Sequence, residues 1–344
     1  MERRSYWTLP GARGELRTEP LDAPAPGEAL VRTLRSGISR GTETLVHLGN
    51  VPEQVRDLMR APFQEGDLPG PVSYGYLSVA VVEQVGDPVS DAELVGRRVF
   101  CLYRHSDRYV APIDMLTPIP DDVPDDRAVL AGAAETAVNA LWDAGPRLGD
   151  RVAVVGGGMI GLTVAALLRR FPLGRLQLVD PDPTRADVAA ALGVPWCTPE
   201  EAVGDCDLVF HTSATEQGLA RSLELLGDEG EVVEMSWYGT DSPRVPLGLD
   251  FHARRLRIRS SQVGMVSDAR RARRTHADRM ALALDCLRDP AFDALLTGPV
   301  AFEDLPATMD DIAHGRIPAL CHVVTYDAPH RERPEETHVP PDRP

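Results

Sequence analysis

The sequence contains no lysine, so all 36 of its basic residues are arginines. Arginine stays protonated in proteins, which excludes both Schiff-base catalysis and a lysine that acts as a general acid. Acidic residues number 52, and the chain therefore carries a formal net charge of -16. This acidic balance argues against general nucleic-acid binding and leaves a small molecule as the expected partner.

Long apolar runs and paired cysteines are also missing. The N-terminal segment has no apolar signal core, and no apolar run reaches the length that spans a membrane. The cysteines are scattered and form no Cys-x-x-Cys pair, so we expect reduced thiols in a cytoplasmic protein that does not contact membranes. They are Cys101, Cys197, Cys206, Cys286 and Cys321.

A glycine motif lies between two apolar runs. The β-branched run 152–155 precedes the glycines, and the apolar run 162–168 follows them without a helix breaker. Glycines in this context allow a tight turn and close approach of the backbone to a pyrophosphate at a helix N-terminus. The motif predicts a bound NAD or, as alternatives, another adenine dinucleotide or an S-adenosyl group. The expected contacts are Gly156, Gly158, Met159, Ile160 and Gly161.

An acidic residue follows the next apolar run. Residues 176–179 end at Asp180, where a carboxylate accepts hydrogen bonds from the ribose hydroxyls of NAD. The same carboxylate repels the 2′-phosphate of NADP. Arg185 lies five residues further on, within reach of the adenine or its ribose. We expect Asp180 to dominate and the cofactor to be NAD(H).

The pattern of apolar residues divides the chain into two regions with different expected secondary structure. Up to about residue 120, short apolar runs alternate with proline and glycine turns, which favours a small β-rich barrel or sandwich. From Arg151 onward strands and helices alternate, which predicts a doubly wound parallel sheet and an α/β fold. A long helix is expected over residues 125–144 between the two regions.

The C-terminal third carries three further expectations. An arginine-rich amphipathic helix is expected over residues 269–288, with its arginines in solvent or on an anionic substrate. The segment 298–326 is expected to return to the kind of structure that the N-terminal region has. The tail 328–344 is charged and rich in proline, and we expect it to be disordered.

Three segments carry a resemblance to a known family. Residues 36–43 read Ser-Gly-Ile-Ser-Arg-Gly-Thr-Glu and look like that family's Gly-Ile-Cys-Gly-Ser-Asp segment. Residues 75–77 stand at the place of its Gly-His-Glu, and residues 135–137 precede the glycine motif. Over residues 1–327 the chain thus resembles the medium-chain dehydrogenase/reductase superfamily of zinc-containing alcohol dehydrogenases. The sequence of residues 36–43 is similar to that of the branch that contains bacteriochlorophyllide dehydrogenase.

The resemblance implies a particular architecture. A GroES-like catalytic domain is expected at residues 1–136 and 265–327, and a Rossmann domain at residues 137–264. Members of the superfamily usually form homodimers through edge strands of their Rossmann domains, so a homodimer is expected here.

The zinc ligands of the superfamily are absent from this chain. Ser39 stands at the position of the cysteine ligand, Tyr76 at that of the histidine and Gly132 at that of the third ligand. A hydroxyl, a phenol and a glycine do not make a tetrahedral zinc site. Cys101 also stands alone where relatives have a lobe with four cysteines and a structural zinc. We therefore expect no metal.

Another group must then stabilise the alkoxide that accompanies hydride transfer. The resemblance implies that Ser39 and Tyr76 face the nicotinamide. Tyr76 needs a charged neighbour to act as a base. The alternative is that Tyr76 only fills the space that the metal occupies in relatives. Glu43 and His47 are candidates for an acid–base or relay pair, with a surface position as the alternative for His47. His105 and Asp107 either line the cleft or form a polar turn.

The resemblance also implies cofactor contacts outside the glycine motif. Arg40 is expected at the pyrophosphate, unless it is a surface arginine. Thr136 is expected near the nicotinamide, unless its hydroxyl bonds to its own helix. Thr212 lies in a loop expected over the cofactor, and Trp237 is expected to line the substrate pocket or to belong to the core.

These observations lead to one functional hypothesis and two alternatives. The chain is expected to be a zinc-independent, NAD(H)-dependent oxidoreductase that interconverts a secondary alcohol and a ketone on a small or medium-sized organic substrate. The first alternative is an NAD(P)H-dependent enoyl or quinone reductase, and the second is a non-catalytic protein that only binds a dinucleotide.

Overall fold

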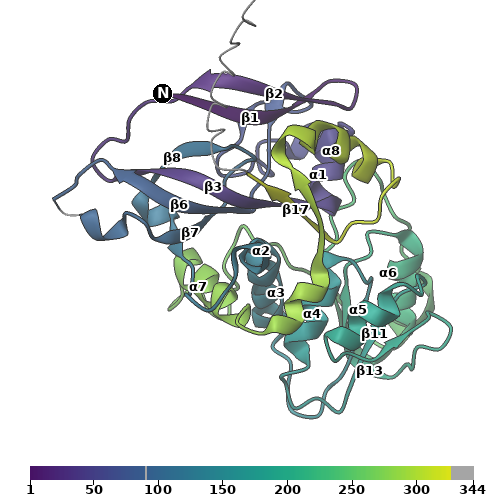
Figure 1. Ribbon diagram of the computed structural model, residues 1–344. Helices are drawn as coiled ribbons and strands as arrows, with labels where there is room; N and C mark the ends of the chain where they lie inside the picture. The colour runs from purple at the N-terminus through teal and green to yellow at the C-terminus, as the bar shows by residue number, and fades with distance from the viewer. Residues whose placement is uncertain (90, 327–344) are drawn as a thin grey trace, which may run out of the picture.

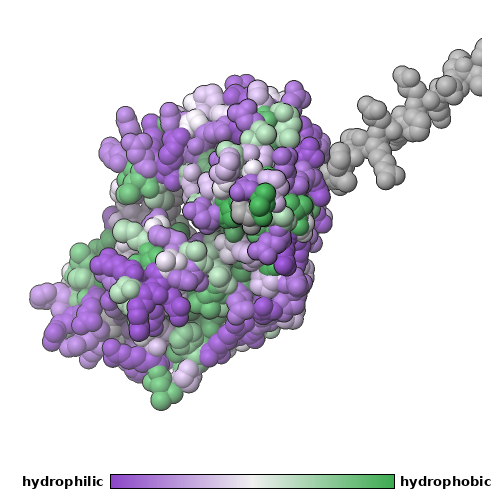
Figure 2. All heavy atoms as spheres, turned by 90° about the vertical axis from the view of Figure 1, so that its left-hand side faces the viewer, coloured by the Kyte–Doolittle hydropathy of each residue, from purple (hydrophilic) through white to green (hydrophobic). Residues whose placement is uncertain are grey.

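The computed structural model describes residues 1–89 and 91–326 and has two parts, one built on antiparallel sheets and one on a parallel sheet (Figure 1). The tail 328–344, expected to be disordered, lies outside the described residues. Within the described ranges, no helix combines the length and the apolar composition needed to cross a membrane. The face drawn in Figure 2 is largely hydrophilic, with hydrophobic atoms in separate patches.

The first part contains a seven-stranded sheet and a four-stranded sheet. The larger one has the order β16-β17-β3-β6-β7-β9 with β8 paired to β3, and the smaller one has the order β2-β1-β5-β4. Their strands are β1 (Glu2–Leu9), β2 (Arg13–Pro20), β3 (Glu28–Ser39), β4 (Glu65–Gly66), β5 (Val72–Ser73), β6 (Ser78–Val85), β7 (Arg98–Cys101), β8 (Arg108–Pro112), β9 (Thr117–Pro118), β16 (Leu296–Ala301) and β17 (Cys321–Thr325).

The C-terminal return to this part, expected from the sequence, is confirmed. Strand β17 pairs antiparallel with β3, and Cys321 lies opposite Ser39. Helix α1 (Arg40–His47) directly follows β3, and α8 (Leu305–Ala313) packs against it. Tyr6, Ile38, Phe302 and Leu305 share one buried cluster, so the two ends of the described chain are held in a common core.

The second part is the expected doubly wound parallel sheet. Its strand order is β12-β11-β10-β13-β14-β15, and all five pairings between neighbours are parallel. Most of its strands are buried apolar runs, and helices lie between several of them, as parallel pairing requires. The elements are β10 (Arg151–Val155), α4 (Met159–Leu168), β11 (Arg175–Val179), α5 (Arg185–Ala191), β12 (Trp196–Cys197), β13 (Cys206–His211), α6 (Glu216–Glu224), β14 (Leu226–Glu234) and β15 (Arg257–Ser260).

Two predicted helices differ from the structure. The helix expected over 125–144 is divided into α2 (Asp125–Ala128) and α3 (Ala131–Ala144). The helix expected over 269–288 is only α7 (His276–Cys286), because Thr275 and Asp278 form a capping box that starts it there. The arginines at 270–274 lie before this cap and are exposed.

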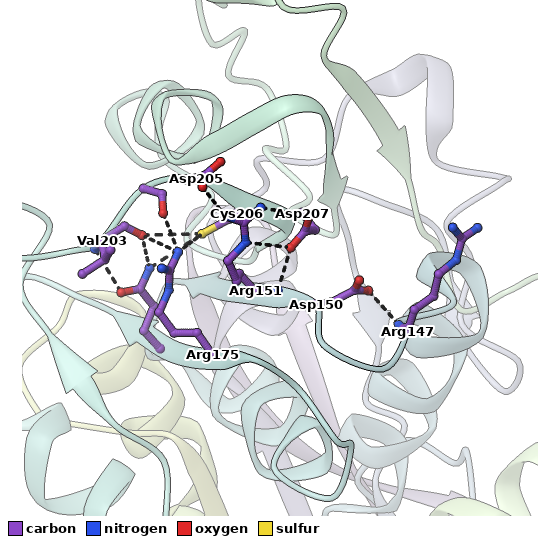
Figure 3. Close-up of polar contacts among 10 residues, drawn as sticks. Arg147, Asp150, Arg151, Arg175, Val203, Asp205, Cys206 and Asp207 are labelled. Carbon is purple, nitrogen blue, oxygen red and sulfur yellow. Dashed lines mark hydrogen bonds and ion pairs between the residues drawn. The ribbon is translucent and has the colours of Figure 1, made fainter.

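Arginines secure the amino-terminal edge of the parallel sheet (Figure 3). Arg151, the first residue of β10, donates to Asp207 at 3.1 Å and also pairs with Asp205. Arg175, the first residue of β11, donates to backbone carbonyls of the loop before β13, Val203 among them. These contacts fix the ends of the strands opposite to the edge where ligands bind in such sheets.

Candidate active site

The glycine loop has the geometry that a diphosphate site needs. Gly156 follows β10 with a φ of 112°, a conformation that favours glycine. A Cβ added to Gly161 would lie 1.9 Å from the carbonyl oxygen of Gly156, so only glycine lets α4 approach the strand. Gly158 has open space around it and precedes Met159 and Ile160, which begin α4. The loop thus leaves a backbone cradle at a helix N-terminus.

Asp180 is bound to this loop. Its Oδ2 accepts a hydrogen bond of 2.5 Å from the backbone N–H of Gly157, and its Oδ1 accepts one of 2.8 Å from Asp182. A Cβ added to Gly157 would lie 3.0 Å from Cγ of Arg185. The acid and the arginine singled out in the sequence therefore meet beside the glycine loop, where the adenosine half of a dinucleotide binds in this fold.

Arg40 brings a cationic group from the first domain to the same place. Desolvation and the like charge of Arg185 lower the pKa of Arg40, while the carboxylates of Asp180 and Asp182 oppose the change. Arginine remains charged despite such a shift. The exposed Arg40 of the first domain thus interacts electrostatically with Arg185 and with the acids that follow β11.

Two threonines expected at the cofactor use their hydroxyls within the protein. Thr212 donates at 3.1 Å to the carbonyl of Val155 and at 2.9 Å to that of Gly156. Thr136 donates at 2.8 Å to the carbonyl of Gly132 in its own helix, which is the alternative weighed from the sequence. Thr212 therefore supports the glycine loop from β13, and Thr136 supports α3.

Trp237 joins the two domains. It follows β14 and packs with Leu45 and Tyr76 against a buried cluster of the first domain that includes Val46 and Tyr74. In the same loop, a Cβ added to Gly239 would lie 2.6 Å from the carbonyl oxygen of Asn50. The loop after β14 and the segment around α1 consequently form opposite sides of one contact.

The three positions that replace the zinc ligands converge. Ser39 ends β3 and is 5% exposed. The Tyr76 hydroxyl interacts with the side-chain hydroxyls of Ser39 and Thr42. A Cβ added to Gly132 would lie 3.9 Å from Cδ2 of the Tyr76 ring. Burial, followed by the nearby Glu43 carboxylate, raises the pKa of Tyr76 to about 12. Tyr76 is therefore protonated at ordinary pH and can donate a hydrogen bond.

This set of groups does not fit zinc. The nearest carboxylate, Glu43, uses Oε1 to accept from the backbone N–H of Ser39 at 2.8 Å and Oε2 to contact His105 Nε2 at 2.9 Å. In the part of the chain that the structure describes, no three His, Cys, Asp or Glu side chains are grouped to hold a metal ion. Uncharged hydroxyl groups such as those of Ser39 and Tyr76 are poor zinc ligands.

Glu43 begins a chain of buried hydrogen bonds. His105 contacts Glu43 through Nε2 and the hydroxyl of Ser36 through Nδ1, at 2.9 Å and 2.7 Å. The Ser36 hydroxyl is in turn 2.9 Å from that of Tyr326. His105 is 1% exposed and lies in the loop between β7 and β8, so the polar turn expected as one alternative is buried. Sequence reasoning named Glu43 and His105 separately but missed Ser36 and Tyr326.

The suggested pair of Glu43 and His47 needs correction, because the two residues have different partners. His47 Nδ1 is 3.2 Å from the hydroxyl of Tyr6, and its Nε2 is 3.5 Å from Asp310 of α8. His47 is also buried, not at the surface, and this burial lowers its pKa. His47 thus connects α1 with β1 and α8, while Glu43 turns toward His105.

A second polar cluster, which sequence reasoning missed, lies at the carboxyl ends of β13 and β14. His211 Nδ1 is 2.7 Å from Glu234 Oε2, and its Nε2 is 2.7 Å from the hydroxyl of Ser213. The Tyr238 hydroxyl donates to Glu234 at 3.2 Å. Burial opposes ionisation of Glu234, but hydrogen bonds from His211 and Ser236 outweigh it and lower the pKa. The signal available in the sequence was a polar residue at the end of each strand.

Known proteins share this architecture. No protein-family model matches the sequence. An L-threonine 3-dehydrogenase of Anaeromyxobacter dehalogenans is 27% identical over 245 residues, which cover 60% of this chain and 66% of that protein. The chain therefore spans slightly less than two thirds of the length of this curated relative.

Solved structures match over nearly the whole chain. A putative zinc-binding dehydrogenase from Sinorhizobium meliloti bound to NADP has a TM-score of 0.74 at 16% identity. A short chain alcohol dehydrogenase from Escherichia coli complexed with NADH has a TM-score of 0.73 at 18% identity. Each match covers 94% of this chain and 99% of the other. The chain thus has the fold of the medium-chain dehydrogenases/reductases, with a GroES-like domain joined to a Rossmann domain.

Proposed function

We propose that this protein is an NAD(H)-dependent oxidoreductase that interconverts a secondary alcohol and a ketone without zinc. The observation that carries the proposal is the convergence of Ser39, Tyr76 and Gly132, in a chain that also has an intact glycine loop. The bound nicotinamide would supply or accept the hydride. The curated relative, a threonine dehydrogenase, supports a secondary alcohol as the substrate class.

Tyr76 and Ser39 take the part of the missing metal in this proposal. A ketone oxygen gains negative charge as hydride reaches its carbon, and hydrogen-bond donors placed at that oxygen lower the barrier. Tyr76 suits the role because its raised pKa keeps the phenol protonated. The Ser39 hydroxyl offers a second donor, since Ser39 and Tyr76 already interact. Glu43 acts behind them: its carboxylate fixes the backbone N–H of Ser39 and lies near Tyr76.

The Rossmann domain supplies the cofactor site. Gly156, Gly158 and Gly161 with the first turn of α4, Met159 and Ile160, would hold the diphosphate. Asp180 supports NAD(H), because its carboxylate is already placed as an acceptor at the adenosine end. Arg40 would reach the diphosphate from the first domain, and Trp237 would border the substrate beside Tyr76. Thr136 and Thr212 would help through the backbone they hold.

A homodimer in the cytoplasm completes the proposal. Strand β15 ends the parallel sheet and all four of its residues are exposed, which supports pairing with the same strand of a second copy. The five cysteines of the described residues are free thiols, which supports a reducing compartment.

The test is transfer of deuterium from 4-deuterated NADH to a panel of ketones, including α-amino ketones and vicinal hydroxyketones. The proposal expects deuterium on the former carbonyl carbon of at least one product. Reduction of C=C bonds instead would favour an enoyl or quinone reductase, and NADH binding without any turnover would favour a non-catalytic protein.

A further inference from the structure

A buried hydrogen-bond chain in the first domain joins residues from three distant regions of the sequence, at residues 36–43, 105 and 326. We refer to the residues Glu43, His105, Ser36 and Tyr326 as the buried chain. Its members come from α1, the loop between β7 and β8, β3 and the residue after β17, and their exposed fractions are 3%, 1%, 1% and 7%. Its three contacts measure 2.9 Å, 2.7 Å and 2.9 Å. All three are within the range of good hydrogen bonds.

One assignment of protons satisfies every contact. A carboxylate only accepts, so His105 donates to Glu43 through Nε2–H, and in this tautomer of the neutral ring Nδ1 accepts. The Ser36 hydroxyl supplies that proton and accepts in turn from the Tyr326 hydroxyl. Each donor therefore points along the chain toward Glu43. Tyr6 also contacts His105, edge-on and with ring centroids 6.3 Å apart. This contact does not interrupt the series of hydrogen bonds.

The two ends of the buried chain lie in different surroundings. At one end, Glu43 is close enough to Tyr76 to raise the pKa of its phenol. At the other end, the carboxylates of Asp107 and Glu303 interact electrostatically with the Tyr326 hydroxyl. Those two carboxylates are 27% and 55% exposed and both pair with Arg4 at the surface. The buried chain thus runs from Glu43, which also accepts from the backbone N–H of Ser39, to Tyr326, whose side chain is 7% exposed.

We propose that the buried chain is a proton relay that connects the Tyr76 hydroxyl with solvent. The inference rests on the proposed function, because each conversion of a ketone to an alcohol consumes one proton in addition to the hydride. Trp237 packs in the same cluster as Tyr76, which supports a proton path through neighbouring side chains.

The relay balances as follows. The ketone oxygen takes the proton of Tyr76 as the new C–H bond forms. The Ser39 or Thr42 hydroxyl then protonates Tyr76 and takes in exchange the proton that Glu43 receives from His105. His105 passes its Nε2 proton to Glu43 and takes the proton of Ser36 at Nδ1. Ser36 takes the proton of Tyr326, which takes one from solvent, and the groups then reorient. Alcohol oxidation runs the same movements in reverse.

Tyr326→Phe tests the relay at the position furthest from Tyr76, since it removes one hydroxyl and no bulk. Tyr103→Phe is the matched control, because Tyr103 is also buried in the first domain and its hydroxyl, which accepts from Arg3, lies outside the buried chain. The measurements are kcat for ketone reduction, the solvent deuterium isotope effect on kcat, the Kd for NADH and the Tm.

The relay predicts that Tyr326→Phe lowers kcat about tenfold and raises the solvent isotope effect, with the Kd for NADH unchanged. His105→Gln keeps both hydrogen bonds but cannot pass a proton on, and its kcat is expected to fall about 100-fold. Tyr103→Phe should match the wild type in kcat and isotope effect.

An unchanged kcat and solvent isotope effect in Tyr326→Phe would overturn the relay while leaving the proposed function intact. A lower Tm without a change in isotope effect would give the buried chain a structural role only, which also overturns it. If the wild type neither binds NADH nor reduces any ketone, the proposed function fails and the relay fails with it.

Discussion

Asp180 accepts a 2.5 Å hydrogen bond from the backbone N–H of Gly157, so the acid that ends β11 is attached to the middle of the glycine loop. The carboxylate is therefore fixed where the ribose of a dinucleotide would enter. Arg40 interacts electrostatically with Asp180 and Arg185, and Arg185 lies beside the same loop, so both arginines would favour a phosphate. Cofactor choice depends on which of these charges dominates.

We expect the carboxylate to dominate, so the wild type should bind NADH more tightly than NADPH. Asp180→Ala should weaken NADH binding about tenfold, which corresponds to about 1.4 kcal/mol, and should strengthen NADPH binding because the two arginines then face the 2′-phosphate alone. Fluorescence titration with both cofactors measures this. Asp187→Ala, an exposed acid on α5, is the control and should change neither Kd. A wild-type preference for NADPH would refute the assignment.

Two glycines of the same loop should respond differently to alanine. Gly161→Ala places a Cβ 1.9 Å from the carbonyl oxygen of Gly156, so it should lower the Tm and abolish NADH binding. Gly158→Ala has open space and should leave the Tm unchanged, yet weaken NADH binding because the new methyl group occupies the diphosphate cradle. Thermal unfolding and NADH titration of both variants separate the two effects. Equal loss of Tm in both would contradict this reading of the loop.

Tyr76→Phe should lower kcat/KM for ketone reduction about 100-fold and leave the Kd for NADH unchanged, because it removes a donor to the reacting oxygen. Ser39→Ala should have a smaller effect of the same kind. Steady-state kinetics of both variants provide the measurement. Since the pKa of Tyr76 is raised to about 12, the rate should show no loss of this donor below about pH 11. Full activity in Tyr76→Phe would mean that Tyr76 only fills space.

Buried tyrosines should make the fold sensitive to high pH. Burial raises the pKa of Tyr76 to about 12, and it also raises the pKa values of Tyr74 and Tyr326. A raised folded-state pKa gives stability that is complete below the unfolded value of about 10 and is lost as the pH rises through the folded value. The free energy of unfolding in urea should therefore be lower at about pH 11 than at about pH 9. Equal values would contradict this burial.

The arrangement of the proposed cofactor site could be predicted because its residues are close in sequence. Gly156, Gly161 and Asp180 belong to one strand–helix–strand unit, and the structure brings them together as expected. The hydrogen-bond partners in the first domain could not be predicted in this way. Ser36 and Tyr326 are separated by 290 residues, and only the pairing of β17 with β3 makes them neighbours.

Local spacing was misleading where tertiary contacts decide. Glu43 and His47 are one helical turn apart, which suggested a pair, but Glu43 faces His105 and His47 faces Tyr6. The helix expected over 269–288 was too long, because arginine favours helices in sequence statistics while the cap at Thr275 fixes the actual start. In both cases one specific contact outweighs the periodic pattern.

The central claim is that hydroxyl groups, not zinc, stabilise the reacting oxygen. The most direct measurement is NADH-dependent ketone reduction by protein that has been dialysed against a strong chelator and assayed for metal content. The account predicts full activity with zinc far below one ion per chain, and no increase when zinc is added. Activity that disappears with the chelator and returns in proportion to added zinc would contradict it.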